Sequence, residues 1–506
     1  MHTDSGPTTP AAGIPTQIVI FGASGDLAAR KLIPAIADNA RFAAFRGPVQ
    51  VIGVARTPMN SQQWRDELAR SLTPAQAQVW PDLAPNLHYV PIGDSSLADY
   101  ARLHETLDDL AGPLAGDVGR LFYLALKPSL FVPTVEALAA EGMLACDSLR
   151  LEGWRRVVVE KPFGTDLATA QWLNIVLRRH LREDQIYRID HYLGKETVQN
   201  ILAFRFENSI FEPIWSRQHI ESVEINVCES LGMEAGRGAY YDTAGALRDM
   251  MANHMMQLMC LVAMEPPASL DAEAVRDEKV KVLRALEPFR DAHDVWTNSV
   301  RAQYARSPGE TEAGYLQEQG VPLQSQTETF VAIRARVHNW RWAGVPFLLR
   351  TGKRLGKRFS SIVIRFRAPP ADLFSGPAAS QMARLRPNEL VFRIQPEEGI
   401  RIGFQVKQPG PGHVMRTAAL GFDYKDLFDG ETPPPYQRLL LDAMHGNATL
   451  FIRGDEAEAA WKFADSIRSG WSAPGAPTPW TYEIGSMGPT QANALWHPHE
   501  GGWSQE

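Results

Sequence analysis

The sequence has few cysteines, no marked excess of charge and no long apolar run. Its 506 residues include three cysteines, Cys146, Cys228 and Cys260, and their wide spacing excludes a disulfide framework and a paired-cysteine metal site. Lys and Arg number 51 and Asp and Glu 58, a net charge of −7, so there is no basic excess for a nucleic-acid partner. We expect the thiols to be small buried residues in a reducing compartment.

Signals for export or membrane insertion are also missing. Residues 1–15 contain no basic region followed by an apolar one, and we expect them to form a disordered leader. The longest apolar stretches, such as 255–264, fall well short of the roughly 20 residues that span a bilayer. We therefore expect a cytoplasmic protein without a membrane partner. Its length corresponds to about three domains of average size, although two large ones are equally allowed.

Short apolar runs alternate with helical patterns over the first part of the chain. Such runs suit strands that are buried on both faces of a parallel sheet. The alternation of strand and helix predicts a doubly wound α/β domain, which we place at residues 16–188. The expected strands lie at 17–21, 49–54, 88–92, 120–126 and 155–159.

The pattern changes after about residue 190. Segments 220–227, 330–337 and 362–366 alternate apolar and polar residues, as antiparallel strands do, and helical patterns such as 249–264 intervene. This predicts a larger α+β domain with a mainly antiparallel sheet over 189–490, followed by a tail at 491–506. The chain is therefore expected to have two domains rather than three.

The first expected strand ends in a glycine turn. Gly22 permits a tight turn, and Gly25 lets backbone N–H groups approach an anion at a helix N-terminus. The G-x-x-G spacing is shorter than the full dinucleotide motif, and Asp26 also suits a simple helix entry. The position of the turn, after the first strand of a β-α series, favours dinucleotide binding.

Two later strand ends carry basic residues. The second strand ends at Arg56 without the carboxylate that usually holds the ribose of NAD, and a guanidinium can bind a 2′-phosphate, so NADP is favoured. Glu160-Lys161-Pro162 follows another strand, where α/β sheets bind ligands. Lys161 could contact both coenzyme and substrate there, and Pro162 suggests a cis bond or a hinge. The alternative is an ordinary strand-ending turn.

The segment 188–196 is the densest in polar side chains. If a helix begins near Asp190, His191 and Lys195 share one face, and with Tyr192 they form a plausible phosphate cradle. The alternative is that Asp190 only caps the helix and Lys195 is solvated.

His254 lies among apolar neighbours in the helical segment 249–264, so we expect it to be mostly buried. A buried histidine with a carboxylate partner is a sound general base, although such a residue is more often part of the core. Asp249 lies five positions earlier, and this spacing does not bring it onto the same face of a straight α-helix as His254.

Together these segments resemble the glucose-6-phosphate dehydrogenase family over about residues 17–489. The resemblance implies a Rossmann-like coenzyme domain and a larger α+β domain, which oxidise β-D-glucose 6-phosphate to 6-phosphoglucono-δ-lactone and reduce NADP. It also implies a homodimer or homotetramer, and no metal, because the coenzyme accepts the hydride. The matching segments are 22–28, 160–164, 188–196, 249–254, 350–355, 459–463 and 485–489.

The resemblance further implies roles for individual residues. His254 would remove the C1 hydroxyl proton, and Asp190 would orient it. Arg358, with Lys357 adjacent, stands where many relatives have a lysine. The implied substrate contacts are Lys161, His191, Tyr192, Lys195, Glu229, Asp249, Lys353 and Arg358. The implied coenzyme contacts are Gly22, Ala23, Ser24, Gly25, Asp26, Leu27, Arg56, Tyr123 and Lys161.

Two other functions stay open at this point. One is an oxidoreductase of the glucose–fructose-oxidoreductase-like class, which also joins a Rossmann domain to an α+β domain and would act without phosphate dependence. The other is a catalytically inactive sugar-phosphate sensor.

Overall fold

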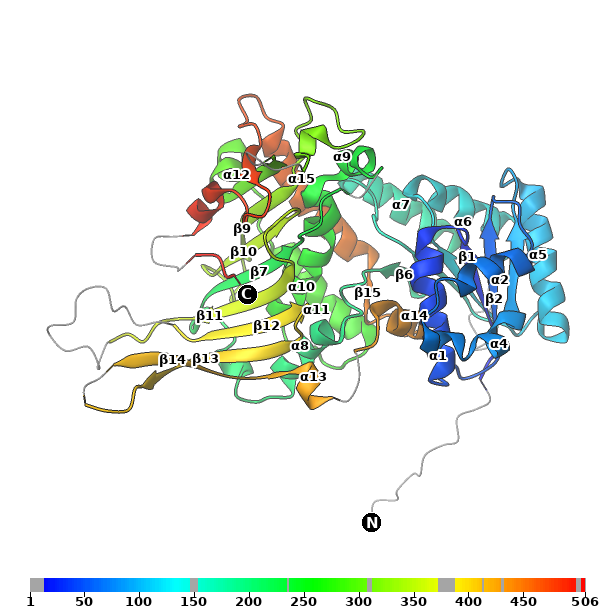
Figure 1. The fold of residues 1–506 in the computed structure, drawn as a ribbon, viewed down its shortest axis with the longest axis horizontal. Helices are drawn as coiled ribbons and strands as arrows, with labels where there is room; N and C mark the ends of the chain where they lie inside the picture. The colour runs from blue at the N-terminus through cyan, green and yellow to red at the C-terminus, as the bar shows by residue number, and fades with distance from the viewer. Residues whose placement is uncertain are drawn as a thin grey trace, which may run out of the picture.

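The computed structural model consists of two lobes, each built on its own sheet (Figure 1). Residues 1–12 of the expected leader and Cys146 lie outside the described residues, whereas Cys228 and Cys260 are buried free thiols, as predicted. No helix among the described residues is both long and apolar enough to cross a membrane. The structure describes residues 13–145, 153–233, 236–306, 312–371, 387–411, 414–428, 432–496 and 502–505.

The sheet of the first lobe has seven strands in the order β15-β6-β5-β4-β1-β2-β3. All neighbours are parallel except β15, which pairs antiparallel with β6. The order β3-β2-β1-β4-β5-β6 is that of a doubly wound dinucleotide-binding sheet, so the predicted fold class of this lobe is confirmed. The strands are β1 (Thr16–Phe21), β2 (Val49–Ala55), β3 (Leu87–Pro91), β4 (Gly119–Leu124), β5 (Arg155–Val159), β6 (Ile186–Ile189) and β15 (Phe451–Ile452).

Both faces of this sheet are covered. Ile18 and Ile20 pack into one hydrophobic cluster, and Val19 and Phe21 pack into another, because alternate side chains of a strand point to opposite faces. The apolar run of β1 is therefore explained by burial on both sides. The helices here are α1 (Ile33–Arg41), α2 (Ser61–Ala69), α3 (Pro74–Ala77), α4 (Trp80–Leu83), α5 (Leu97–Ala111), α6 (Phe131–Ala140) and α7 (Leu167–His180), with a π-helical turn, η1 (Ala28–Leu32).

A segment from late in the chain completes the first lobe. The helix α14 (Pro435–His445) lies beside α1, and the Asn39 side chain donates a hydrogen bond to the carbonyl of Gln437 at 3.0 Å (Figure 1). Arg156 of β5 donates to the carbonyl of Ala443 at 2.9 Å. The two lobes therefore share the chain rather than dividing it at a single point.

The sheet of the second lobe has nine strands in the order β14-β13-β12-β11-β7-β10-β9-β8-β16. Only the pairs β7–β10 and β8–β16 are parallel, so the predicted mainly antiparallel sheet is confirmed. The strands are β7 (Ile220–Cys228), β8 (Ser299–Ala305), β9 (Phe330–Arg336), β10 (Pro346–Gly352), β11 (Phe359–Phe366), β12 (Glu389–Gln395), β13 (Gly399–Lys407), β14 (Met415–Asp423) and β16 (Trp480–Glu483).

A helical layer buries one face of this sheet. Met251, Met255 and Leu258 are fully buried in the same cluster as Val223 and Ile225 of β7, which confirms the expected buried helical segment. The helices of this lobe are α8 (Glu196–Phe206), α9 (Gly238–Ala246), the π-helical η7 (Leu247–Met255), α10 (Met256–Ala263), α11 (Ala272–Ala285), α12 (Ala292–Asn298), α13 (Tyr424–Leu427) and α15 (Gly454–Trp471).

Candidate active site

A pocket of about 450 Å³ opens where the ends of several elements meet. It lies beyond β5, β6, β7 and β10 and against the π-helical η7. Eight of the residues that the sequence suggested for substrate or catalysis line it: Lys161, His191, Tyr192, Glu229, Asp249, His254, Lys353 and Arg358.

His254 and Asp190 form a buried pair at this pocket. Nδ1 of His254 lies 2.5 Å from Oδ1 of Asp190, and the two residues are 1% and 2% exposed. Nε2 of His254 has no hydrogen-bond partner among the described residues. The His254 ring stacks on that of Tyr192, with centroids 4.6 Å apart, and meets that of His191 edge-on. The imidazole is thus held in one orientation, with one nitrogen left for a ligand.

The charge of Asp190 follows from its surroundings. Burial alone would raise the pKa of the Asp190 carboxyl, but the neighbouring His254 reverses this and lowers that pKa to about 2. Ligand atoms of Asp190, His191 and His254 all lie within 4.8 Å of one another. The 2.5 Å contact between Nδ1 of His254 and Oδ1 of Asp190 is a hydrogen-bond distance, shorter than the roughly 3.3 Å that separates two ligand atoms of one tetrahedral metal ion.

The segment before α8 differs from the prediction. No helix begins near Asp190, because residues 190–195 form a turn and α8 starts at Glu196. Oδ1 of Asp190 accepts the backbone N–H of Tyr192 at 2.9 Å, a local bond that competes with helix formation. His191 and Lys195 therefore do not share a helix face, and Nζ of Lys195 instead donates to Gln395 at 2.6 Å.

Asp249 and His254 line the same pocket despite their five-residue spacing. The reason is the π-helical geometry of η7, in which each hydrogen bond joins residues five apart. This winding brings positions i and i+5 to nearby faces, whereas a straight α-helix separates them. The sequence-based argument that the two residues diverge assumed an α-helix and is wrong for this segment.

Lys161 and Asp249 form an ion pair at the pocket wall. Nζ of Lys161 donates to Oδ1 of Asp249 at 2.9 Å and to its backbone carbonyl at 3.1 Å. Burial alone would lower the pKa of the Lys161 ammonium, but Asp249 raises it above its usual value. Burial would raise the pKa of Asp249, but Lys161 and Lys353 lower it to about 2. The Lys161–Pro162 bond is cis, one of the two expected possibilities.

A second ion pair lies at the end of β7 and β10. Nζ of Lys353 donates to Glu229 at 2.7 Å and lies 5.2 Å from the ring centroid of Tyr241. Arg358 lines the pocket, whereas Lys357 donates to the carbonyl of Gln505 at 3.3 Å. Of these two basic neighbours, Arg358 is therefore the one placed at the pocket.

His191 has a depressed pKa at this site. Burial, and then the nearby His254, lower the pKa of the His191 imidazole well below its usual value of 6.5. His191 is therefore neutral at pH 7 in the ligand-free protein.

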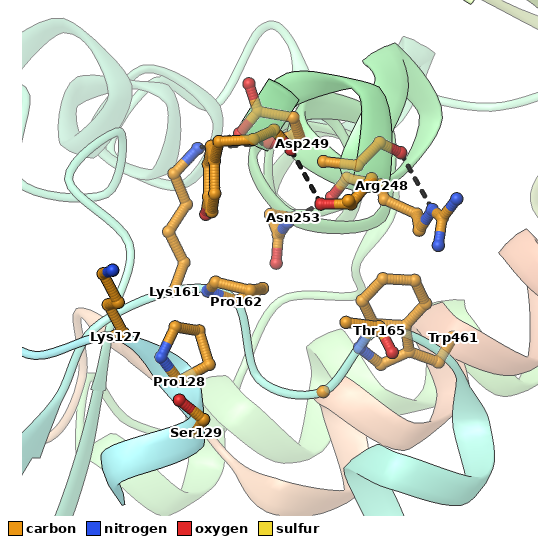
Figure 2. A pocket seen from close by; sticks show the side chains of 14 residues that line it. Lys127, Pro128, Ser129, Lys161, Pro162, Thr165, Arg248, Asp249, Asn253 and Trp461 are labelled. Carbon is orange, nitrogen blue, oxygen red and sulfur yellow. Dashed lines mark hydrogen bonds and ion pairs between the residues drawn. The ribbon is translucent and has the colours of Figure 1, made fainter. Parts of the chain in front are cut away.

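A second pocket of about 320 Å³ adjoins the first (Figure 2). Lys161, Asp249 and Tyr240 line both pockets. Figure 2 shows the Lys161 side chain reaching toward Asp249, with Lys127 and Pro128 at one side and Trp461 at the other. Lys161 therefore stands between two spaces, as a residue in contact with two ligands would.

The glycine turn predicted to hold the coenzyme follows β1. Gly22 has a φ of +83°, and a Cβ there would lie 2.2 Å from the carbonyl oxygen of Ala125, so only glycine fits. The Ser24 hydroxyl accepts a hydrogen bond at 3.1 Å from Thr57, the residue after exposed Arg56. The turn that contains Ala23, Asp26 and Leu27 thus lies next to the end of β2.

Tyr123 was expected to line the coenzyme site, but its side chain is fully buried in β4. Its hydroxyl donates to Glu160 at 2.5 Å, and Tyr436 donates to the same carboxylate oxygen at 3.3 Å. The reason is that both faces of this sheet are covered, so a side chain within the central strand β4 is buried whichever face it points to. Tyr123 therefore supports the strand end that carries Lys161.

Some pocket residues were not found from the sequence. Tyr240, Tyr241 and Gln395 line the first pocket, and Gln395 precedes a cis proline. The adjacent residues Tyr240 and Tyr241, shortly before η7, are a sequence signal that could have pointed to this pocket. Gln395 gave no such signal, because it reaches the pocket from a strand more than 100 positions after His254.

Comparisons with known proteins agree with this geometry. Residues 19–200 match the family model "Glucose-6-phosphate dehydrogenase, NAD binding domain", and residues 202–504 match "Glucose-6-phosphate dehydrogenase, C-terminal domain". The glucose-6-phosphate 1-dehydrogenase of Aggregatibacter actinomycetemcomitans is 45% identical, with 94% of this chain and 95% of the relative covered. That of Mycolicibacterium smegmatis is 43% identical, with 96% and 97% covered.

Solved structures give the same result. A glucose-6-phosphate dehydrogenase in complex with its substrate glucose 6-phosphate superimposes with a TM-score of 0.86 and 33% identity, covering 98% of this chain and all of that one. The enzyme from Mycobacterium avium gives a TM-score of 0.79 at 33% identity, covering 97% and 99%. The chain therefore belongs to the glucose-6-phosphate dehydrogenase family.

Proposed function

We propose that this protein oxidises β-D-glucose 6-phosphate at C1 to 6-phosphoglucono-δ-lactone and reduces NADP. The observation that carries the proposal is the buried His254–Asp190 pair, whose free Nε2 belongs to a pocket with basic walls. Oxidation of a phosphorylated sugar at C1 needs a base near the C1 hydroxyl and cationic groups near the phosphate. The pocket supplies both.

His254 acts as the general base in this proposal. Its Nε2 takes the proton of the C1 hydroxyl, while Asp190 holds the ring through Nδ1 and stabilises the imidazolium that forms. Because the pKa of Asp190 is about 2, its carboxylate stays charged throughout. Glu229 and Asp249 accept hydrogen bonds from the sugar hydroxyls, and each is held by a lysine.

The phosphate is held by the remaining polar side chains of the pocket. The pocket is lined by His191, Tyr192 and Arg358. Lys195 donates a hydrogen bond to Gln395, which also lines the pocket. A guanidinium can bind a phosphate through two parallel hydrogen bonds, which suits Arg358 to this role.

The coenzyme is held by the turn 22–27, Arg56 and Lys161. The fit rests on Gly22, which leaves backbone room that any other side chain would fill, and on the N-terminus of η1 directly after the turn. When bound, the nicotinamide accepts the hydride from C1. Arg56 is exposed at the end of β2, where no carboxylate competes for the ribose, and this supports NADP over NAD.

The protein is proposed to work as a homodimer or homotetramer in the cytoplasm. The outer strands β13 and β14 are the evidence for an oligomer. They reach away from the helical layer (Figure 1) and expose apolar side chains such as Leu420, which is 68% exposed. Exposed apolar side chains of this kind often belong to a protein interface.

A direct assay tests the proposed reaction. Purified protein should reduce NADP with glucose 6-phosphate and not with glucose at the same concentration. Activity on unphosphorylated sugars would favour the glucose–fructose-oxidoreductase-like alternative. Binding of glucose 6-phosphate without turnover, in protein whose circular dichroism shows a folded chain, would indicate the inactive sensor instead.

A further inference from the structure

Two arginines and two tryptophans fasten residues 502–505 to the central strands of the second lobe. We propose that this clasp, defined as Arg350, Arg365, Trp496 and Trp503, positions the Lys353–Glu229 pair of the active site and so sets the affinity for substrate. The inference rests on the proposed function, because substrate affinity is its readout.

Stacking contacts form the first part of the clasp. The guanidinium of Arg350 lies 4.8 Å from the ring centroid of Trp503, and that of Arg365 lies 4.5 Å from that of Trp496. The two indoles meet edge-on with centroids 5.8 Å apart. Arg350 and Arg365 are both buried on the sheet, so water is kept away from these cation–π contacts. Such contacts are stronger when they are shielded from water.

Hydrogen bonds to the backbone form the second part. Arg350 donates to the carbonyl of Ser504 at 2.7 Å, and Arg365 donates to that of Gly502 at 3.2 Å. The N–H of Ser504 donates to the fully buried carboxylate of Glu224 at 2.8 Å. Trp503 also donates from its indole to the carbonyl of Ala492 at 3.0 Å. The segment is therefore held in one register by charged groups of β7, β10 and β11.

The same strands lead directly into the active site. Arg350 of β10 pairs in parallel register with Asn226 of β7, and its Nε donates to the Asn226 side chain at 2.9 Å. Lys353 and Glu229, which form the ion pair at the pocket, stand three positions later, directly after the ends of the two strands. At about 3.3 Å per residue, the Arg350 end of the clasp lies roughly 10 Å along the strands from that pair.

The turn between β10 and β11 is held at both ends. The N–H of Glu229 donates to the carbonyl of Gly352, and the N–H of Leu355 donates to the carbonyl of Glu229, both at 2.9 Å. Nζ of Lys357 donates to the carbonyl of Gln505, so the residue beside Arg358 also contacts the segment. Lys353 and Arg358, two of the proposed substrate contacts, therefore lie on backbone that the clasp restrains. Trp503 and Arg350 are positioning residues in this account, since neither lines the pocket.

The test compares Trp503→Ala with Trp340→Ala, a control at a tryptophan that is 95% exposed. Loss of one shielded cation–π contact should raise the KM for glucose 6-phosphate about three- to tenfold. The kcat and the KM for NADP should stay within twofold, and Trp503→Phe should restore most of the affinity. In a Lys353→Ala background, Trp503→Ala should raise the KM for glucose 6-phosphate by less than twofold, because Lys353, the residue through which Trp503 acts, is gone.

An unchanged KM in Trp503→Ala, or an equal increase in the Lys353→Ala background, would overturn the proposal. Hydrogen exchange on the wild-type protein gives a second measurement if the alanine variant does not fold. Saturating glucose 6-phosphate should slow exchange at residues 502–505 together with residues 352–359, and no change at 502–505 would count against the clasp. Absence of any dehydrogenase activity in the wild-type protein would instead contradict the proposed function itself.

Discussion

Nδ1 of His254 and Oδ1 of Asp190 lie 2.5 Å apart, although 64 positions separate the two residues in sequence. Asp190 follows the last parallel strand of the first lobe, and His254 stands on the π-helical η7 of the second. The pair therefore joins the lobes at the pocket, and the proposed chemistry depends on that contact.

Replacing His254 by Asn should remove the proposed general base and leave substrate binding nearly intact. General-base catalysis contributes about 10²–10⁴-fold, so kcat should fall by that factor, or roughly 3–5 kcal/mol. Steady-state kinetics and the dissociation constant for glucose 6-phosphate measure the two effects. A kcat within fivefold of the wild-type value would show that His254 is not the general base.

Asp190→Asn should lower kcat by about 10²-fold or more, because the neutral amide neither fixes the productive tautomer of His254 nor stabilises its imidazolium. The matched control is Asp184→Asn, at an exposed carboxylate six positions earlier. Equal turnover in the two variants would show that the buried contact is only structural.

Arg56→Ala should weaken use of NADP without changing use of NAD. The loss of charge-assisted hydrogen bonds to the 2′-phosphate should reduce kcat/KM for NADP about 10- to 100-fold. Arg70→Ala, at another exposed arginine of the same lobe, serves as the control. Parallel losses with both coenzymes would show that Arg56 does not recognise the 2′-phosphate.

His191 should make substrate binding depend on pH. Burial and then His254 lower its pKa well below 6.5, so the free protein holds it neutral at pH 7. A bound phosphate dianion would raise that pKa, so binding should take up protons and tighten as pH falls from 8 to 7, a range above the second pKa of about 6 at which the substrate phosphate itself gains a proton. Calorimetry in buffers of different ionisation enthalpy measures the uptake. His191→Asn should reduce it, whereas the exposed control His219→Asn should not.

Gly22→Ala should impair both folding and coenzyme binding. The left-handed backbone costs about 1–2 kcal/mol for any residue with a Cβ, and the clash with the Ala125 carbonyl adds to this. Gly142→Ala is the control, because Gly142 has a φ of +70° with open space around its Cβ position. The fall in melting temperature should be clearly larger for Gly22→Ala. Similar values in both variants would mean that the turn relaxes.

Local patterns were enough to predict five of the seven strands described in the first sheet, three of the nine described in the second, and several residues that line the pocket. The apolar run of β1 reflects burial on both faces, and the glycine turn reflects a backbone conformation that only glycine adopts freely. The helix expected near Asp190 was wrong because a side-chain bond to the Tyr192 N–H replaced the first helical turn. The coenzyme contact expected at Tyr123 stays a prediction, and its side chain is buried because both faces of the central strand β4 are covered.

The sequence alone determined the two kinds of sheet, the basic character of the strand ends and the family resemblance, because all of these depend on short-range patterns and residue type. Only the tertiary structure decided which of those residues meet. The π-helical winding of η7 brings Asp249 and His254 into one pocket, and the junction of the lobes sets Asp190 against His254. Such contacts depend on the packing of elements far apart in the chain, and no local pattern encodes that packing.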